Sequence, residues 1–556
     1  MSILIDKTKL LNCFCLITAL FIGCDPYEKP KIKIEAPDQG QFLPANTPIQ
    51  VEISGPSDQL DRVRINGGDA FPLIRLGSNR VAFTHPAVDG VGFVTADLPD
   101  DPYLVNRSWL QGEFIPSAAW YPDTFTLRIA GAELNEGNSS IAGLLQKTLE
   151  NAEVSEFVNP IEIEFGTLQA QVIIDSAVIE QLTVTLMIED DQLRVNLVIS
   201  PLILTYRIES DLITTTGSGR YDIIRVNSDT LTEPRGVTLL NPDVELSDLE
   251  VQDDQLPDWI LNLLIEGLLD QFKSAVTEAI SEVTMEVTGQ LFSQLRPTLG
   301  LELPFPINQE TTLAGVFPLS GGLELQYQTK VGAVSPQMIA AAGALSASPP
   351  RELIGWAGSS IHIGKPLLNQ YAFAAWDAGN FSNLAYSRAR LEALGLGELE
   401  FPYSNIERAV VHLLLPPIAG WDAGGAYLEL GGIKVDMKID LSKDTQAWTS
   451  ARIPIKLVQM NGALRILRDE NREIIAQPIM LNRLNVLAER NEVLKLIRVA
   501  LPGVVADVFG ELPVIRLPQL TVQGLPDAPQ LTIDPRVIGV SNLVDQWRVE
   551  LDLEVR

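Results

Sequence analysis

The chain has 556 residues, 46% of them hydrophobic, and a formal net charge of -30 at pH 7. Such an excess of negative charge opposes attraction to nucleic acid and to anionic headgroups, so neither is expected as a partner bound by charge. The length is typical of roughly two to four domains.

The N-terminal 23 residues have the layout of an export signal. Lys7 and Lys9 precede an apolar stretch from Leu10 to Ile22. A membrane-spanning helix needs roughly 20 residues and this stretch has only about 13, so it predicts a leader rather than a span. We expect the leader to cover 1–23 and a short tether to cover 24–30.

The leader ends in a run, Leu20 to Cys24, that resembles the lipobox of bacterial lipoproteins. In that motif a small residue, here Gly23, precedes a cysteine that becomes acylated, although Phe21 stands where Leu is usual. The alternative is an ordinary signal peptide with a chance cysteine. The other two cysteines lie inside the leader, so no disulfide is expected. Cys24 is predicted to carry palmitate-type acyl chains that hold the protein on a membrane.

Residues 31–105 predict a small all-β module, because short alternating runs are separated by Gly, Pro and Asp turns. One such run is Ile49 to Ile53, with apolar residues at every second position. The strings Ile34 to Gly40 and Val63 to Gly67 resemble the opening of bacterial Ig-like domains. That resemblance implies a β-sandwich that serves as a spacer or an adhesion module.

A Pro- and aromatic-rich stretch over 106–123 predicts a linker, since proline breaks helices and central strands. Long strands follow it. Apolar and polar residues alternate from Leu182 to Ile188 and, after the turn 189–192, from Leu193 to Ile199. The same period runs from Ile433 to Ile439. These runs predict antiparallel meanders.

Apolar residues three or four positions apart predict amphipathic helices at four places. Short helices are expected over 141–152 and 366–378, and longer ones over 257–295 and 493–509. A short helix and then a long one occur in the same order twice, so one architectural unit is expected to be repeated. The residues of these helices expected to line apolar grooves are Leu144, Leu145, Leu261, Leu264, Leu268, Phe272, Ala275, Ala279, Leu368, Tyr371, Trp376, Leu494, Ile497 and Leu501.

The repeated unit resembles the bactericidal/permeability-increasing protein (BPI) family of the tubular lipid-binding (TULIP) superfamily. Three stretches carry the resemblance: Leu256 to Pro297, Leu368 to Gly379, and Leu494 to Val514. It implies an α+β fold of tandem BPI-like barrels, in which long antiparallel strands wrap on amphipathic helices, joined by a central sheet. The barrels would cover 124–305 and 306–556. The chain lacks the disulfide of the animal members and the basic tip of the endotoxin-binding members, so endotoxin recognition by charge is not implied.

The resemblance implies a lipid-binding or lipid-transfer protein that holds acyl chains in the grooves of its two barrels. A bound phospholipid or other acyl lipid would then be the ligand, and the N-terminal anchor would place the protein in the bacterial cell envelope, facing the periplasm or the cell surface. The alternative is a non-transporting envelope protein whose Ig-like module binds a partner protein while the barrels serve as a scaffold.

Catalytic motifs are missing from the sequence. His85, His362 and His412 are the only histidines, and none of them falls at a metal-ligand spacing such as HExxH. The chain has no GxSxG elbow, P-loop or dinucleotide fingerprint. Neither an enzyme, a metal site nor a cofactor is therefore predicted.

Overall fold

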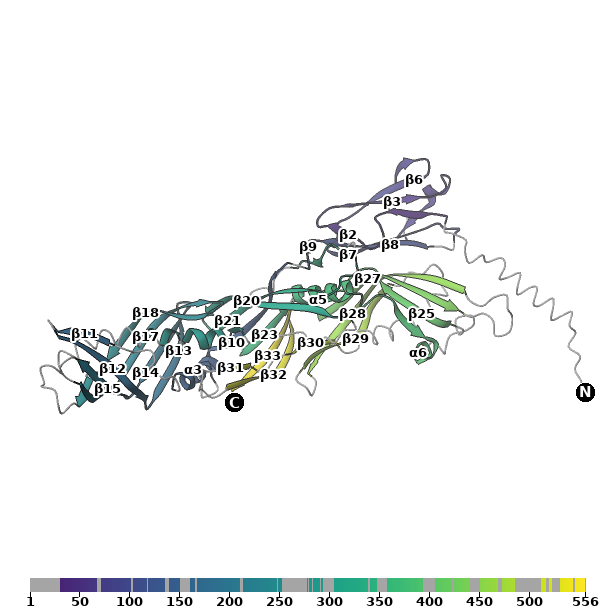
Figure 1. Ribbon diagram of the computed structural model, residues 1–556. Helices are drawn as coiled ribbons and strands as arrows, with labels where there is room; N and C mark the ends of the chain where they lie inside the picture. The colour runs from purple at the N-terminus through teal and green to yellow at the C-terminus, as the bar shows by residue number, and fades with distance from the viewer. Residues whose placement is uncertain are drawn as a thin grey trace, which may run out of the picture.

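The computed structural model shows an elongated molecule with a smaller β module beside one of its halves (Figure 1). It describes residues between 31 and 555, with breaks. The longest breaks are 151–160, 253–277, 294–304, 348–357, 394–405, 440–450 and 486–511. Cys24 and the leader lie outside the described residues. In the described part, no helix is both long and apolar enough to cross a membrane.

The smaller module is a sandwich of two four-stranded sheets, called here the N-terminal sandwich. Apolar side chains from both sheets, among them Ile34, Val51, Val94 and Trp109, form one buried core. The strand β8 (Leu104–Gly112) continues the second sheet into the stretch predicted to be a linker. One sheet has the order β1 (Lys33–Ala36), β3 (Ile49–Ser54), β6 (Arg80–His85), β5 (Ile74–Gly77), and the other β2 (Gln41–Pro44), β8, β7 (Gly90–Asp97), β4 (Arg64–Ile65).

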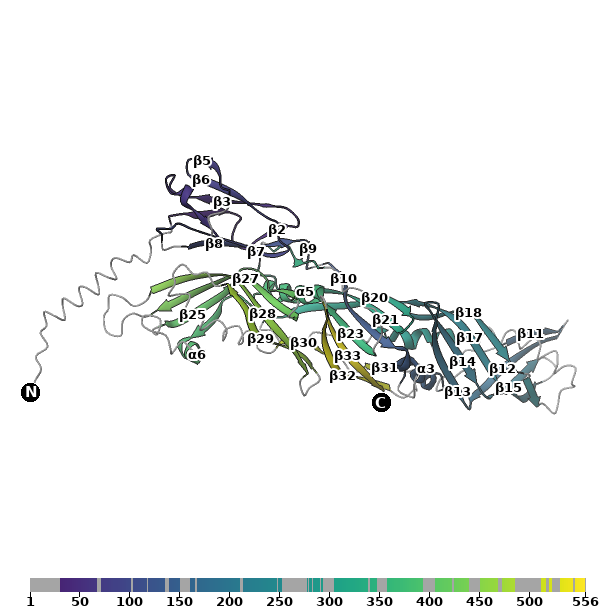
Figure 2. The ribbon, with the colours of Figure 1, turned by 180° about the vertical axis from the view of Figure 1, so that it is seen from behind.

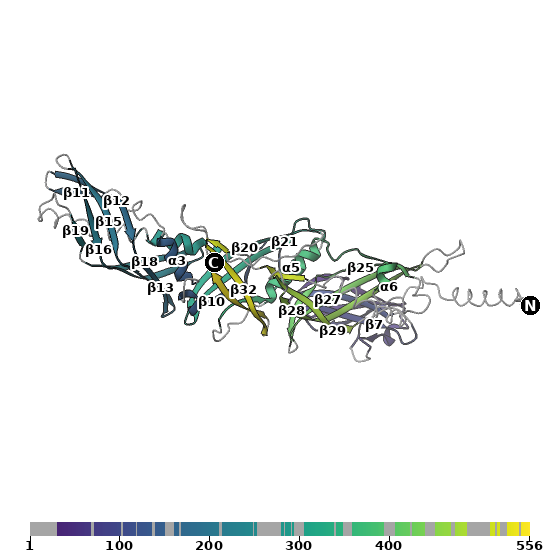
Figure 3. The ribbon, with the colours of Figure 1, turned by 90° about the horizontal axis from the view of Figure 1, so that it is seen from below.

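A seven-stranded central sheet joins segments from distant parts of the chain. Its order is β20 (Ile307–Leu319), β21 (Gly322–Ala333), β10 (Tyr121–Ala130), β23 (Ser359–Gly364), β33 (Gln546–Val555), β32 (Leu531–Leu543), β31 (Leu520–Val522). Figure 3 shows that β10, β20, β21 and β32 lie in the middle of the long axis.

The two faces of the central sheet differ in chemistry because side chains alternate along a strand. On one face Leu127 pairs with Leu325 and Ile361 across the neighbouring strands, and all three are buried. On the other face Arg128 pairs with Glu324 and Ser360. The apolar face therefore forms a core, and the polar face holds a buried charged cluster.

Two antiparallel sheets extend from the central sheet toward one end of the molecule. The turn between β13 and β14 contains Asp190 and Asp191 at φ 52° and 59°, values that a two-residue hairpin turn requires. One sheet has the order β11 (Ile161–Phe165), β12 (Leu168–Ile179), β15 (Leu202–Ser210), β16 (Thr214–Tyr221), β19 (Leu249–Gln252). The other has β13 (Leu182–Glu189), β14 (Gln192–Ile199), β17 (Ile224–Glu233), β18 (Gly236–Leu246).

A further seven-stranded sheet occupies the other end. Its order is β24 (Leu384–Ser387), β25 (Ile406–Leu413), β27 (Gly425–Ile439), β28 (Ala451–Arg468), β29 (Glu473–Asn485), β30 (Leu512–Arg516), and β26 (Ile418–Asp422) pairs with β27. The short strands β9 (Phe114–Ile115) and β22 (Ala344–Leu345) form a separate pair.

The described helices are few. They are α2 (Gly131–Asn135), α3 (Ile141–Glu150), α5 (Lys365–Asp377), α6 (Arg388–Ala393) and the 3-10 turn η1 (Leu60–Arg62). The described residues between 278 and 293 are also helical. The hydroxyl of Ser140 accepts a hydrogen bond from the Gly143 N–H at 3.0 Å, so it caps α3.

The predicted α+β fold of tandem BPI-like barrels wrapped on amphipathic helices is wrong. The molecule is mostly β, with 59% of it in strands and 16% in helices, and it contains several separate sheets. The physical reason is that the strands satisfy one another's backbone hydrogen bonds over long ladders, such as β27 with β28. Apolar residues three or four positions apart show where helices form, but in this fold sheets and not helices provide most of the framework.

The helix α5 carries buried polar side chains that bond to several separate segments. Asn369 donates to the Leu345 carbonyl at 3.2 Å and accepts from the Ala419 N–H at 2.9 Å. The indole N–H of Trp376 donates to the Leu413 carbonyl at 2.8 Å. Just beyond the helix, the Asn380 side chain bonds both backbone groups of Phe305 at 2.9 Å. These bonds fix α5 against four strands or loops at once.

We predict that Asn369→Ala lowers the free energy of unfolding by about 2–4 kcal/mol, because it leaves two buried backbone groups unpaired at about 1–3 kcal/mol each. Urea titration followed by tryptophan fluorescence measures this. The matched control is Asn227→Ala on the exposed face of β17, expected to change stability by less than about 0.5 kcal/mol. Equal effects of the two substitutions would contradict the anchoring role of Asn369.

Candidate functional site

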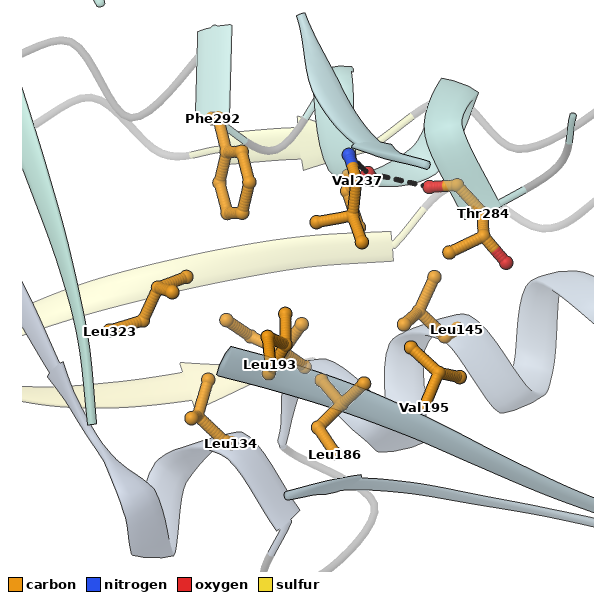
Figure 4. A pocket seen from close by; sticks show the side chains of 11 residues that line it. Leu134, Leu145, Leu186, Leu193, Val195, Val237, Thr284, Phe292 and Leu323 are labelled. Atoms are coloured by element: carbon orange, nitrogen blue, oxygen red, sulfur yellow. Dashed lines mark hydrogen bonds between the residues drawn. The ribbon is translucent and has the colours of Figure 1, made fainter. Parts of the chain in front are cut away.

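A small apolar cavity lies where α2, α3, the described helical residues between 284 and 292 and two sheets meet (Figure 4). In the close view Phe292 and Val237 point into it from one side, and Leu134 and Leu186 point into it from the other. None of the described residues that line it is charged. The described lining residues are Leu134, Ile141, Leu145, Leu186, Leu193, Val195, Val237, Thr284, Thr288, Phe292 and Leu323.

The helical wall of the cavity is formed by Thr284, Thr288 and Phe292, which follow one another at intervals of four residues. This interval places them on one face of the helix. All three are buried. Three side-chain hydrogen bonds tie this helix to the sheets. The Val237 N–H donates to the Thr288 hydroxyl at 2.8 Å, the Tyr327 hydroxyl donates to the Phe292 carbonyl at 3.3 Å, and the Thr238 hydroxyl donates to the Met285 sulfur at 3.8 Å.

The sheet wall is set by β13 and β14, whose residues pair without interruption. Leu186 is the cross-strand partner of Val195, and both are buried on the inner face. Beside this sheet, α3 presents Ile141 and Leu145 to the cavity. Strand alternation and helical periodicity thus direct apolar side chains to one point from separate elements.

The two threonines of the wall differ in their hydrogen bonds. The Thr288 hydroxyl accepts from Val237 and donates to the Thr284 carbonyl at 2.6 Å. The Thr284 hydroxyl is buried and has no hydrogen-bond partner among the residues that the structure describes. The cavity therefore has one unused polar group in an otherwise apolar wall.

The cavity is narrow. Its volume is only ≈ 10 Å³, about the room that a single water needs. An acyl chain therefore enters only if the wall moves.

The predicted groove residues are placed in three different ways. Leu144 and Leu145 belong to the buried core around the cavity, and Leu145 lines it. Leu368 and Tyr371 pack through α5 against the same core, but neither lines the cavity. Trp376 lies near Phe42 of the N-terminal sandwich, at a ring-centroid distance of 6.0 Å. Outside the described residues lie Leu261, Leu264, Leu268, Phe272, Ala275, Ala279, Leu494, Ile497 and Leu501.

Most of the lining was not predicted. Leu186, Leu193 and Val195 belong to alternating runs that the sequence shows, yet alternation identifies only the inner face and not the point on it that meets a helix. Thr284 and Thr288 give no signal in the sequence, because a threonine pair at this spacing is ordinary on an exposed helix.

The polar face of the central sheet holds a buried histidine–serine pair. Nε2 of His362 lies 2.9 Å from the Ser360 hydroxyl, a pairing of the kind that activates a nucleophile. Burial, together with the positive charges of Arg128 and Arg548, lowers the pKa of His362 to about 3. Both residues of the pair are only 2% exposed. Such an imidazole is a poor proton acceptor at neutral pH, so the pair is unsuited to general-base catalysis.

Comparison with known proteins finds a distant structural likeness and no family. No family model matches the chain, and no curated protein matches it. Among solved structures the chain is similar to a lipopolysaccharide binding protein, with 12% sequence identity and a TM-score of 0.36, over 78% of this chain and 99% of that one. A likeness of this size does not establish a shared fold.

We predict opposite effects for two matched substitutions in the cavity wall. Thr288→Val should lower the free energy of unfolding by about 1–3 kcal/mol because the buried Val237 N–H loses its acceptor. Thr284→Val should leave stability unchanged or raise it, by up to about 1 kcal/mol, because it removes a buried hydroxyl that has no partner. Urea titration of both variants measures the difference, and destabilisation by Thr284→Val as large as that by Thr288→Val would contradict it.

A second prediction concerns pH. Because the folded pKa of His362 is about 3 against an ordinary value of 6.5, the unfolded chain takes up a proton at mildly acid pH that the folded chain does not. Stability from this residue is full above pH 6.5 and falls, by on the order of 4 kcal/mol, as the pH drops toward 3. His362→Gln should remove this part of the acid destabilisation in urea titrations between pH 7 and pH 4. If the free energy of unfolding depends on pH in the same way in the variant and the wild type, the predicted contribution of His362 is contradicted.

Proposed function

We propose that the protein binds a lipid, with an acyl chain held between α3, the helical residues 284–292 and the inner face of β13 and β14. One observation carries the proposal: side chains from helices and from two sheets converge on an apolar cavity inside the main core, and none of its described lining residues is charged. An uncharged lining selects against polar and ionic ligands because their groups would be left unpaired.

The chemistry of the lining favours a hydrocarbon chain. Each buried methylene group contributes about 0.8 kcal/mol to binding. Among the described lining residues only Thr284 and Thr288 are polar, and the Thr288 hydroxyl is already bonded within the protein. Binding of this kind needs no covalent step, so the proposed function is not that of an enzyme.

The proposal has a finer part that rests on the sequence. Cys24 and its lipobox-like run support an acylated N-terminus, which would hold the lipid-binding body on a membrane of the bacterial cell envelope. Transfer of the bound lipid, to or from that membrane or with the help of an envelope protein partner, belongs to this part. The distant BPI-like resemblance of the sequence agrees with it.

A second candidate function is a non-transporting envelope protein whose N-terminal sandwich binds a partner. One feature favours it: β5 is the edge strand of its sheet, and its side chains Ile74 and Leu76 are 61% and 47% exposed. An exposed apolar edge is suited to pairing with another chain. Under this function Ile74→Asp would abolish partner binding and leave any bound lipid unchanged.

The lipid proposal is tested by filling the cavity. Native mass spectrometry of the protein without residues 1–24 should detect bound phospholipid or fatty acid. Val195→Phe, which adds volume to the lining, should reduce the bound fraction roughly tenfold while costing about 1–3 kcal/mol of stability. The matched control is Leu197→Phe, on the same face of β14 and in the same core but outside the cavity lining.

The control should lose a similar amount of stability and keep its lipid. Equal loss of lipid in both variants would assign the effect to general destabilisation. A wild-type protein that carries no lipid, and takes up none from mixed phospholipid vesicles, would overturn the proposed function.

A further inference from the structure

The N-terminal sandwich is packed firmly against the half of the molecule that contains α5 and β27. Figure 2 shows β7 and β8 lying along β27. Val91 and Leu110 of the sandwich share a buried core with Leu415 and Ile418. Leu110 and Leu415 are both fully buried, so no water layer separates the two parts at this point. This region is called here the sandwich contact.

Aromatic side chains extend the sandwich contact to α5. The Phe42 ring lies edge-on to Phe114 at a centroid distance of 5.2 Å, and 6.0 Å from Trp376. Trp376 is 4% exposed and its indole N–H is bonded to the Leu413 carbonyl. The apolar body of the indole is therefore covered by the sandwich, while its polar atom is satisfied within the larger part.

Backbone hydrogen bonds reinforce the contact. The short strands β9 and β22 pair antiparallel, with Phe114 opposite Leu345. The Ser346 N–H donates to the Glu113 carbonyl at 2.7 Å. A module that swings freely on a linker makes no such ladder.

Glycines permit the close approach. A Cβ on Gly431 would lie 2.6 Å from Cγ1 of Val91, and one on Gly432 would lie 2.8 Å from the Ser108 hydroxyl. Gly432 also has φ +63°, which side chains rarely adopt. The surface of β27 is thus shaped to fit the sandwich at these two positions.

We infer that the N-terminal sandwich is a fixed cap on an apolar surface formed by α5, β22 and β26, rather than a mobile spacer. The cap occupies the place where an apolar ligand would otherwise contact Trp376, Leu415 and Ile418. This inference rests on the proposed function, because it assigns the same class of ligand, a hydrocarbon chain, to the covered surface. With the cap in place, acyl binding is confined to the cavity beside α3.

The test releases the cap in the full chain. Phe42→Asp puts an unpaired carboxylate into the apolar contact, and Gly431→Leu acts as a second, steric variant that introduces no charge. Ser78→Asp is the matched control, since it adds the same charge to the same module in an exposed turn. Two quantities are measured on each protein: hydrogen exchange at the Ser346 amide, and the number of dansyl-undecanoic acid molecules bound at saturation.

In the wild type the Ser346 amide should exchange slowly, as the amides of the central sheet do. Phe42→Asp and Gly431→Leu should raise its exchange rate roughly tenfold or more and add about one bound probe molecule per chain. The control should change neither quantity. This pattern supports the cap.

Other results overturn it. Fast exchange of the Ser346 amide in the wild type, or unchanged exchange in both variants, would show that the contact does not hold the sandwich. Faster exchange without additional probe would show that the covered surface takes no acyl chain, while the binding seen in the wild type stands. No probe bound to any of the proteins would overturn the proposed function and the cap together.

Discussion

The hydrogen bonds made by the buried polar side chains of α5 are the constraint on which the rest of the structure depends. Asn369, Trp376 and the neighbouring Asn380 each bond backbone groups of segments far away in the sequence. A buried backbone group without a partner costs about 1–3 kcal/mol, so these segments are held where the helix can reach them. In this way one helix sets the positions of β22, β25, β26 and the start of β20.

The fixed orientation of α5 gives its two faces different neighbours. Leu367 and Tyr371 pack on the apolar face of the central sheet, in the same core as Leu144 and Leu145 of α3. Trp376 points away from that core and lies under the N-terminal sandwich. The core that contains the cavity and the contact that holds the sandwich are therefore linked through one rigid element, although they lie in different parts of the molecule.

The sequence predicted local structure well and long-range structure poorly. Alternation identified β13 and β14, because a pleated strand with one buried face must place apolar residues at every second position. The prolines of 106–123 suggested a linker, yet β10 begins at Tyr121 with Pro122 as its second residue. The ladder shifts register between Tyr121 and Phe125, so no hydrogen bond from the proline nitrogen is needed there. The pairing of Leu127 with Leu325 and Ile361 has no local signature at all.

The same limit explains the error in fold class and the missed lining of the cavity. Helical stripes show that a helix has an apolar face, but not whether helices or sheets supply most of the burial. Val195 and Leu197 are equivalent in the sequence pattern and both are buried, yet of the two only Val195 lines the cavity. That difference depends on where Thr284, Thr288 and Phe292 cross the sheet, which the contacts of distant strands decide.

The walls of the cavity differ in how firmly they are held, and this decides how a ligand could enter. The sheet wall is part of a continuous ladder from Leu182 to Glu189 against Gln192 to Ile199, so moving it breaks many bonds together. The described helical wall is tied to the sheets by side-chain hydrogen bonds at Thr288 and Phe292. Each such bond contributes about 0.5–1.5 kcal/mol net, and burial of about two methylene groups offsets it at roughly 0.8 kcal/mol each. Outward movement of the helix is therefore the less costly way to enlarge the cavity, because the acyl chain replaces the apolar contacts that the helix loses. In this way a cavity the size of one water becomes a lipid site.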